Sequence, residues 1–484
     1  MLVGGGWLVL AAASAQTLGG WTQMQGDASH SGSLADAAQP PYRGSWHLDV
    51  PLGGPAGDFG FSQPVSDGSS VIAVGPTQIV AADLETGVQQ WTVDRDYGPS
   101  VSPAIAVTPH RRILIYTEGF GDSPPGSSAT PSTSASPSAS PSASASDGGS
   151  FDSHVAAIDL DTREPAWDAP VPLHAISRTG VTVDGDTAFL GDNAGHVYAV
   201  AVATGEVRWT ADAGGFLTTP PAVSNDLVIV VVQGDRSSRP RLVAYHESDG
   251  SRAWSDDIQG GAIFASSPAI GGDQVVVGFS DKTVRAFALS DGADRWSARL
   301  NNAIFFTGAA AVSSDAVVVV DAAGQVYRLD PDTGDRVWDY AVNEPVIRSP
   351  AVIAGGNVLV ATSKGRLAAI DLGSGLLVWQ SEQGNGMLRS LALAPQVVVG
   401  VRGGVEPGLV GFAHDPSGTL VSLVSPTEID LSKLFLAFFA AAVPLALLAI
   451  LAGRWLRTRM GPAFLDDEDD APELAGEDLE GADG

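Results

Sequence analysis

The chain has 484 residues, of which 44% are hydrophobic, and it contains no cysteine. The lack of cysteine excludes disulfides, thiolate metal sites and cysteine nucleophiles from its chemistry. Its formal net charge of −29 at pH 7 repels phosphate backbones, so nucleic acid is not expected as a partner.

The N-terminal segment, residues 1–15, is apolar and ends in Ala13-Ser14-Ala15. Small residues in this A-x-A pattern are typical of a signal-peptide cleavage site, although no basic residue precedes the apolar stretch. We expect a signal-peptide-like segment followed by an exported domain, with a buried first strand as the alternative. Residues 16–45 form a lead-in to that domain.

A repeat then occupies residues 46–432. Each unit has a β-branched run, a short polar turn, a second strand, a turn that resembles D-x-x-T-G, and a strand with a tryptophan. The pattern has no helical periodicity, and the units are about 42 residues long apart from one longer interval, which is the length of a propeller blade. The tryptophans of the seven clear units are Trp91, Trp167, Trp209, Trp254, Trp296, Trp338 and Trp379.

The position four residues before each tryptophan holds glycine in all units but one, where Arg163 takes its place. Glycine supplies the positive φ that a tight hairpin needs. The glycines at this position are Gly87, Gly205, Gly250, Gly292, Gly334 and Gly375.

Trp46 lies about one repeat before Trp91, and residues 391–423 form a last unit without a tryptophan. The strand with Trp46 is therefore expected to complete the last blade and close the ring, which leaves few free strand edges. We predict an all-β, eight-bladed β-propeller, with seven blades as the alternative. The eight tryptophans are expected to fill the gaps between blades as core residues.

Residues 121–150 interrupt the second unit with a run of serine, alanine, threonine and proline. No core can form from such a composition, so the insertion is expected to be disordered. It resembles O-glycosylated stalks, and an unmodified flexible insertion is the alternative.

Two sets of side chains are candidates for binding. Arg178, Arg348 and Arg389 each precede the expected innermost strand of a blade, at one mouth of the axial channel, and together predict an anion or partner site. Paired surface arginines are the alternative. His154 and His196 share one blade position that is polar in every unit, so a solvated strand start is favoured over a metal site there.

The C-terminal part contains a run of 20 uncharged residues, Leu434–Gly453, long enough to span a bilayer as a helix. We expect a transmembrane helix over residues 433–454. The arginines at 454, 457 and 459 place the following side in the cytoplasm. Residues 455–484 are acidic and are expected to form a disordered cytoplasmic tail.

The signature A-x-D-x-x-T-G-x-x-x-W resembles the pyrroloquinoline-quinone (PQQ) repeat, and WTQMQGDASHSG (residues 21–32) is similar to the lead-in of such propellers. The resemblance implies one of two classes. Quinoprotein dehydrogenases bind PQQ and Ca²⁺ on the propeller axis, whereas BamB-like propellers of the outer-membrane assembly machinery use the ring for protein contacts. The chain has no vicinal cysteine pair and mostly minimal blades, so it resembles the non-catalytic class more closely.

These features together predict a single-pass membrane protein whose propeller lies on the extracytoplasmic side. It is expected to bind another envelope protein or ligand, and to be neither an enzyme nor the carrier of a cofactor or a metal ion. A PQQ-dependent dehydrogenase and an envelope ligand sensor remain as alternatives. The repeat aspartates, such as Asp83 and Asp330, are expected to stabilise turns by accepting backbone N–H bonds.

Overall fold

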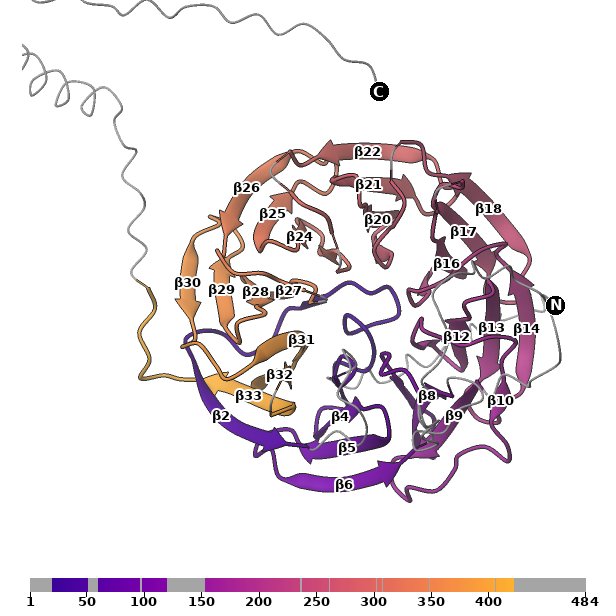
Figure 1. Ribbon diagram of the computed structural model, residues 1–484, viewed down its shortest axis with the longest axis horizontal. Coiled ribbons are helices and arrows are strands. Elements are labelled where there is room, and N and C mark those ends of the chain that lie inside the picture. Colours follow the sequence, from indigo (N-terminus) through magenta and orange to yellow (C-terminus); the bar gives the residue numbers. More distant parts are fainter. Residues whose placement is uncertain are drawn as a thin grey trace, which may run out of the picture. The chain divides into compact units, whose positions relative to one another are not determined.

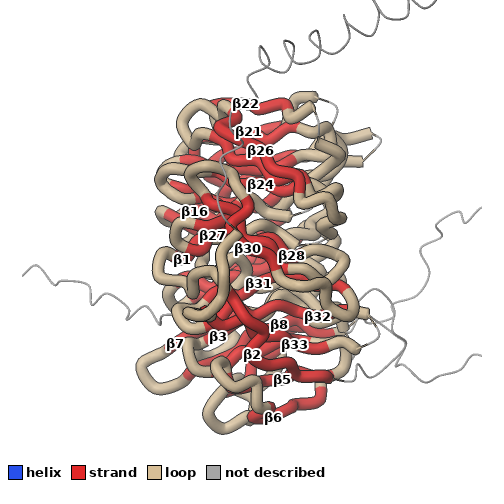
Figure 2. The backbone as a smooth tube through the Cα atoms, turned by 90° about the vertical axis from the view of Figure 1, so that its left-hand side faces the viewer, coloured by secondary structure: helices blue, strands red, loops and turns tan. Residues whose placement is uncertain are grey.

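The chain forms a ring of eight sheets around one axis, and their strands pair antiparallel except for one two-residue strand of the lead-in, which pairs parallel with the innermost strand of its sheet (Figure 1). Across the described residues the secondary structure consists of strands, turns and loops, and no helix is present (Figure 2). The predicted all-β, eight-bladed propeller is confirmed, and the seven-bladed alternative is wrong. The computed structural model describes residues 20–50, 60–95, 98–119, 153–235, 237–260, 262–301, 303–306, 308–347, 349–404 and 406–421.

The first four blades follow one another along the chain. Blade 1 contains β3 (Val65–Ser66), β4 (Ser70–Val74), β5 (Gln78–Asp83) and β6 (Gln89–Asp94). Blade 2 contains β7 (Ala104–Val107), β8 (Arg112–Glu118), β9 (His154–Asp159) and β10 (Val171–Pro172). Blade 3 contains β11 (Thr182–Asp184), β12 (Thr187–Gly191), β13 (His196–Ala201) and β14 (Val207–Asp212). Blade 4 contains β15 (Ala222–Ser224), β16 (Leu227–Val232), β17 (Arg241–His246) and β18 (Arg252–Asp257).

The second half repeats this plan and then closes the ring. Blade 5 contains β19 (Ala269–Gly271), β20 (Gln274–Gly278), β21 (Thr283–Ala288) and β22 (Asp294–Arg299). Blade 6 contains β23 (Ala311–Val312), β24 (Val317–Val320), β25 (Gln325–Leu329) and β26 (Arg336–Ala341). Blade 7 contains β1 (Ser33–Leu34), β27 (Val352–Ala354), β28 (Asn357–Ala361), β29 (Leu367–Asp371) and β30 (Leu377–Gln380). Blade 8 contains β31 (Met387–Leu393), β32 (Val397–Gly403), β33 (Gly408–His414) and β2 (Tyr42–Asp49).

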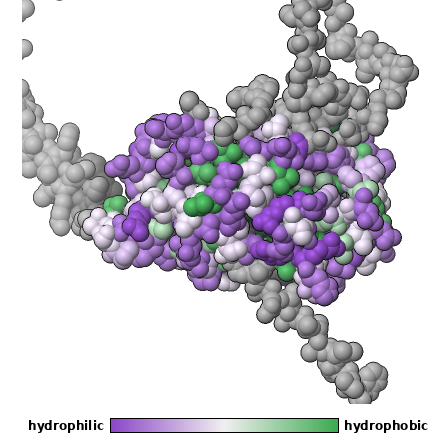
Figure 3. All heavy atoms as spheres, turned by 90° about the horizontal axis from the view of Figure 1, so that it is seen from below, coloured by the Kyte–Doolittle hydropathy of each residue, from purple (hydrophilic) through white to green (hydrophobic). Residues whose placement is uncertain are grey.

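The burial of each strand follows from its place in the blade. The second strands are β-branched runs that are buried along their whole length, as in β16 and β20, because each blade packs between two neighbours. The outermost strands alternate instead, as in β14, because one face meets solvent. The edge of the disc in Figure 3 is accordingly mainly hydrophilic, with a few apolar patches.

The repeated tryptophans lie between adjacent blades. The indole of Trp296 donates a hydrogen bond to the carbonyl of Pro331 in the next blade, with an N–O distance of 2.8 Å. Gly334 lies under the same ring, and a Cβ atom there would collide with it. The same two contacts recur for Trp46, Trp167, Trp209, Trp254 and Trp338.

Arg163 shows how the one unit without the glycine keeps this arrangement. It has a φ of 68°, close to the values of the glycines at the same position. Positive φ is costly for a residue with a side chain, yet the guanidinium lies 5.8 Å from the centre of the Trp91 ring. A cation–π contact with the tryptophan of the preceding blade therefore takes the place of the glycine contact.

The ring closes where the chain passes from its last blade to its first. Strand β2 pairs antiparallel with β33, so the N-terminal strand supplies the outermost strand of blade 8. Trp46 on β2 then donates a hydrogen bond to the carbonyl of Leu84 in blade 1, at 3.2 Å. The predicted closure by the strand that carries Trp46 is confirmed.

The lead-in occupies the centre of the ring, where the indigo trace lies in Figure 1. It binds the innermost strand of one blade after another, because these strands would otherwise expose unpaired backbone groups at the axis. The side chain of Gln23 makes two hydrogen bonds with the backbone of Val183 in blade 3. The carbonyls of Trp21, Thr22, Ala28, Ser29, Ser31 and Gly32 accept from the N–H groups of Ser66, Ile105, Val223, Ile270, Val312 and Ile353, respectively.

His30 of the lead-in is fully buried at the axis. Its Nδ1 lies 3.2 Å from the carbonyl of Pro268 in blade 5, and its Nε2 lies 3.0 Å from the hydroxyl of Thr182 in blade 3. Burial lowers the pKa of His30 from 6.5 to about 4, although Asp27 and the Pro268 carbonyl act in the opposite direction. The imidazole is therefore neutral in the folded protein at pH 7.

This buried imidazole predicts a loss of stability in mild acid. Because the folded pKa is lower than the unfolded one, the unfolded chain binds more protons below pH 6.5, and stability falls as the pH falls towards 4. Between pH 7.5 and pH 5 we expect His30 to account for a loss of about 2 kcal/mol in the free energy of unfolding. Urea unfolding of the wild type and of His30→Gln at both pH values checks this. Equal losses in the two proteins would contradict it.

Several predicted segments lie outside the described residues. They are residues 1–15, the insertion 121–150, the helix expected at residues 433–454 with its Leu434–Gly453 core, and the tail 455–484. Among the residues that are described, no helix has the length and the apolar character needed to cross a membrane.

Candidate functional site

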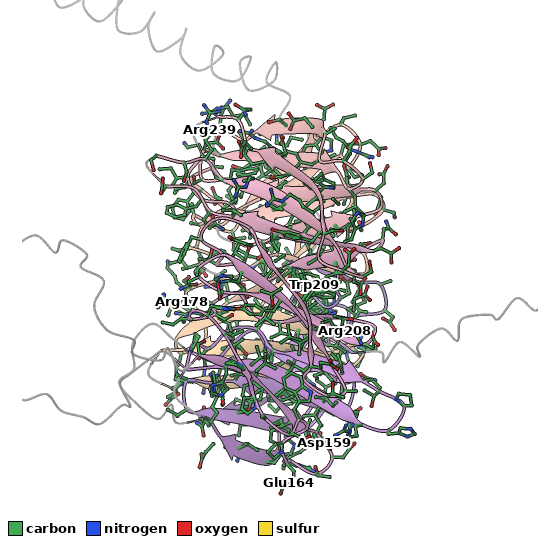
Figure 4. All side chains as sticks on the ribbon, turned by 90° about the vertical axis from the view of Figure 1, so that its right-hand side faces the viewer. Asp159, Glu164, Arg178, Arg208, Trp209 and Arg239 are labelled. Atoms are coloured by element: carbon green, nitrogen blue, oxygen red, sulfur yellow. The ribbon has the colours of Figure 1, made fainter. Side chains whose placement is uncertain are left out.

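A cavity of about 760 Å³ opens on the axis of the propeller. Each of the eight blades contributes to its wall, from Gln63 in blade 1 to Ser390 in blade 8, and Met24 of the lead-in also lines it. Most of the wall residues come directly before the innermost strands, so the cavity lies on the face where the chain enters each blade. Arg178, which precedes β11, lies towards the left-hand side of the disc in Figure 4.

The wall of this axial cavity differs in charge from the rest of the protein. Among the described residues that line it, the side chains are mostly serine, threonine, glutamine and apolar, and Arg178 is the one charged residue. The chain as a whole carries a net charge of −29. A wall whose described residues include a cation and no carboxylate favours a neutral or anionic group over a cation on such a protein.

Exposed apolar side chains surround one side of the cavity. We call them the apolar rim: Phe216, Ile263, Phe264, Ile304 and Phe305. Their exposed fractions range from 38 to 61%, and they come from the loops that lead into blades 4, 5 and 6. Exposed apolar groups that gather in this way mark an interaction surface more often than scattered ones do.

The three phenylalanines of the apolar rim occupy equivalent positions. The carbonyls of Phe216, Phe264 and Phe305 accept hydrogen bonds from the N–H groups of Gln233, Ser280 and Ala322, which follow the second strand of their blades. These bonds tie the loop to the blade and leave the aromatic side chains on the surface. The repeat therefore builds the same loop conformation three times in succession.

The structure places the predicted arginines differently from one another. Arg178 lines the axial cavity. Arg389 lies within β31 and not before it, because β32 is long enough to pair with residues 387–389 as well. Its Nη2 is 3.6 Å from the sulfur of Met387. Arg348 lies outside the described residues.

The predicted histidines are in separate places. His154 contacts Glu118 on the neighbouring strand of blade 2, with Nε2 2.9 Å from the carboxylate. His196 lies beside Asp192 in blade 3. The repeat aspartates stabilise turns as predicted: Asp83 accepts from the hydroxyl and the N–H of Thr86, and these bonds lower its pKa.

Sequence reasoning missed the apolar rim. Its signal was the recurrence of Phe216, Ile263-Phe264 and Ile304-Phe305 at nearly the same distance before an innermost strand. Hydrophobic residues next to a strand are normally assigned to the core, so the pattern did not separate exposed side chains from buried ones.

Comparison with known proteins gives the family. The profile of the family described as "Outer membrane protein assembly factor BamB" matches residues 152–304 and 280–427, together more than half of the chain. Proteins of that name from Yersinia pestis and Moranella endobia (strain PCIT) are 25% and 23% identical over 243 and 245 residues. These matches cover 48% of this chain and 52% and 53% of the relatives, so the chain spans about half the length of the curated relatives it matches.

Solved structures share the fold at low sequence identity. BamB from Moraxella catarrhalis is 13% identical, with a TM-score of 0.56 over 77% of this chain and 99% of that one. A europium-containing methanol dehydrogenase is also 13% identical, with a TM-score of 0.58 over 81% of this chain and 91% of that one. These likenesses support the propeller fold and do not choose between its functions. On the match of its repeats to the family profile, this chain belongs to the BamB family of β-propellers.

Proposed function

We propose that this chain is a non-catalytic scaffold that binds another protein of the cell envelope at the axial face of its propeller. The observation that carries this proposal is the apolar rim, which exposes three equivalent phenylalanines beside a cavity whose described wall residues include no carboxylate. Aromatic side chains are enriched at protein interfaces, and a few buried anchors usually supply most of the binding energy.

The partner is a protein with a complementary apolar segment. The rim has no charge of its own, and Arg178 in the adjoining cavity wall offers a hydrogen-bonding cation to an acidic or carbonyl group of that partner. If Arg348 and Arg389 approach Arg178 in the complex, the three form the predicted anion site, whose affinity falls as salt rises.

The placement in the envelope rests on the sequence and on the names of the relatives. Proteins named as outer membrane assembly factors are the curated relatives of this chain. In the proposed topology residues 1–15 direct export and Leu434–Gly453 crosses the membrane once. The propeller then lies on the extracytoplasmic side and residues 455–484 lie in the cytoplasm. The insertion 121–150 is a flexible loop on the outer surface, with or without glycans.

A PQQ-dependent dehydrogenase is the second candidate, because a methanol dehydrogenase shares the fold and the cavity lies on the axis. PQQ carries three carboxylates, and the Ca²⁺ that accompanies it needs oxygen ligands with negative charge. Among the described residues, the cavity wall offers one cation and no carboxylate. This composition supports the scaffold proposal.

Adding PQQ and Ca²⁺ to the purified protein tests this choice. We expect no saturable heat in calorimetry and no dye-linked oxidation of alcohols or sugars, because the cavity wall lacks the charges that would hold the cofactor and the ion. Uptake of one PQQ per chain, abolished by Arg178→Ala, would overturn the scaffold proposal in favour of the enzyme.

A further inference from the structure

Blade 3 contains a group of potential metal ligands outside the axial cavity. One nitrogen of His174, one nitrogen of His196 and one carboxylate oxygen of Asp192 all lie within 4.8 Å of one another. The two imidazole rings are 4.4 Å apart, centre to centre, and tilted by 31°. The cluster combines the two side-chain types, imidazole and carboxylate, that bind divalent transition metals.

The fold brings these side chains together from two segments. Asp192 begins the turn between β12 and β13, and His196 is the first residue of β13. His174 comes from the loop between β10 and β11. The turn is fixed by Asp192 itself, whose Oδ1 accepts from the N–H groups of Ala194 and His196 at 2.9 and 3.0 Å.

A buried tyrosine orients the cluster from behind. The hydroxyl of Tyr198 donates to Asp192 Oδ2 at 2.8 Å and accepts from the N–H of His174 at 2.9 Å. The side chain of Asp192 has no exposed surface, whereas that of His196 is 29% exposed. Hydrogen bonds of this kind to a ligating carboxylate hold it in place in metal sites.

The turn at Asp192 does not by itself require the two histidines that lie beside it. Blade 6 builds the same turn with Asp321, whose Oδ1 accepts from Ala323 and Gln325. The second oxygen of Asp321 accepts from the N–H of Ile304 at 2.9 Å, which closes the arrangement. In blade 3 the corresponding oxygen faces His196, with Nδ1 3.1 Å away. The histidines of blade 3 are therefore an addition to a turn that is complete without them.

We propose that His174, Asp192 and His196 bind a divalent transition metal ion of the zinc type. Zinc bonds of about 2.0–2.1 Å in a tetrahedron separate the ligand atoms by roughly 3.3 Å. His196 Nδ1 and Asp192 Oδ2 are 3.1 Å apart, close to this separation. His174 Nδ1 lies 2.6 Å from the Tyr198 hydroxyl, so its Nε2 is the atom left to bind the ion. Each neutral imidazole presents a lone pair to the ion and keeps its hydrogen on the other nitrogen, so no redox step is involved.

The ion links two parts of the axial face. It ties the loop that contains His174 to the turn at Asp192, and the same loop continues to Arg178 in the wall of the axial cavity. Three protein ligands leave at least one position of the ion open to solvent. A side chain of a bound protein or a water molecule occupies that position.

Calorimetry with ZnCl₂ on the full-length chain, purified in detergent without a histidine tag, tests the site. We expect one ion per chain at pH 7.5 and an affinity about 100-fold lower in His174→Ala and in His196→Ala, since each loses one of three ligands. His246→Ala, in an exposed histidine of blade 4, serves as the matched control and keeps the affinity.

Asp192→Asn separates the ligand role from the turn. The amide oxygen still accepts the two N–H bonds of the turn, and the Tyr198 hydroxyl, which donates to Oδ2 in the wild type, accepts from the amide nitrogen in the variant. The variant keeps the turn but loses the charged ligand, so it binds zinc more weakly. MgCl₂ should give no saturable heat, because magnesium does not favour imidazole. Zinc binding that is unchanged in all three variants, or absent from the wild type, would overturn the proposal.

Discussion

Replacing Trp296 with alanine is expected to lower the free energy of unfolding by about 3–5 kcal/mol, as for other large aromatic residues removed from a core. Trp296 is 8% exposed and packs in a cluster with residues of blades 5 and 6, among them Val276 and Tyr327. The change leaves a cavity between blades. It also removes the donor to the Pro331 carbonyl. Urea unfolding followed by tryptophan fluorescence and circular dichroism measures the loss.

Two variants control this experiment. Trp296→Phe keeps most of the apolar area and loses the indole N–H, so its loss should be smaller than that of alanine. Val337→Ala changes a side chain that is 50% exposed in blade 6, and its effect should stay within about 0.5 kcal/mol. A loss below about 1 kcal/mol for Trp296→Ala would show that the tryptophans do not hold the blades together.

The fold could be predicted because every blade has the same packing requirement. A blade must bury both faces of its sheet, so the sequence repeats a β-branched run, a tight turn and a tryptophan at a fixed spacing. Trp46 could be assigned to the last blade for two reasons. The residues before it do not contain a repeat unit of their own, and the last unit, residues 391–423, has no tryptophan. Arg163 stands where the other clear units have glycine, yet it adopts the positive φ of that turn. Its guanidinium lies over the Trp91 ring in a cation–π contact.

The lead-in was visible only as a similarity to other propellers. Nothing in residues 21–32 indicates that the segment binds one innermost strand after another, because its bonds are made by backbone groups that any residue possesses. Burial of His30 follows from that path, and a single histidine in a polar stretch gives no sign of it.

The candidate sites were harder to predict than the fold. Arg178 precedes β11, as counting from its strand indicated, whereas Arg389 lies inside β31, because β31 is longer than the innermost strands of blades 3 to 6. The apolar rim resembles core sequence, and exposure depends on how a loop leaves its blade. His196 was noticed, but His174 and Asp192 were not, because their approach depends on the loop between β10 and β11 and on Tyr198.

The apolar rim is expected to carry most of the partner's binding energy. Replacing both Phe264 and Phe305 with aspartate removes two aromatic anchors and places two charges in the interface, so partner affinity should fall at least 100-fold. Val88 directly precedes the outermost strand β6 and Val337 lies in the outermost strand β26; neither lines the axial cavity, and they are 64% and 50% exposed. Val88→Asp with Val337→Asp is therefore the matched control and should leave the affinity unchanged.

Site-specific photocrosslinking in intact cells tests the central claim most directly, because it reports which face of the propeller a partner touches. A photoreactive phenylalanine analogue is placed at position 264, 305, 88 or 337, one at a time, and the adducts are identified by mass spectrometry. We predict one recurrent envelope protein attached at 264 and 305, and no such adduct at 88 or 337. Adducts confined to 88 and 337, or the same adducts at all four positions, would contradict a scaffold that binds its partner through the apolar rim.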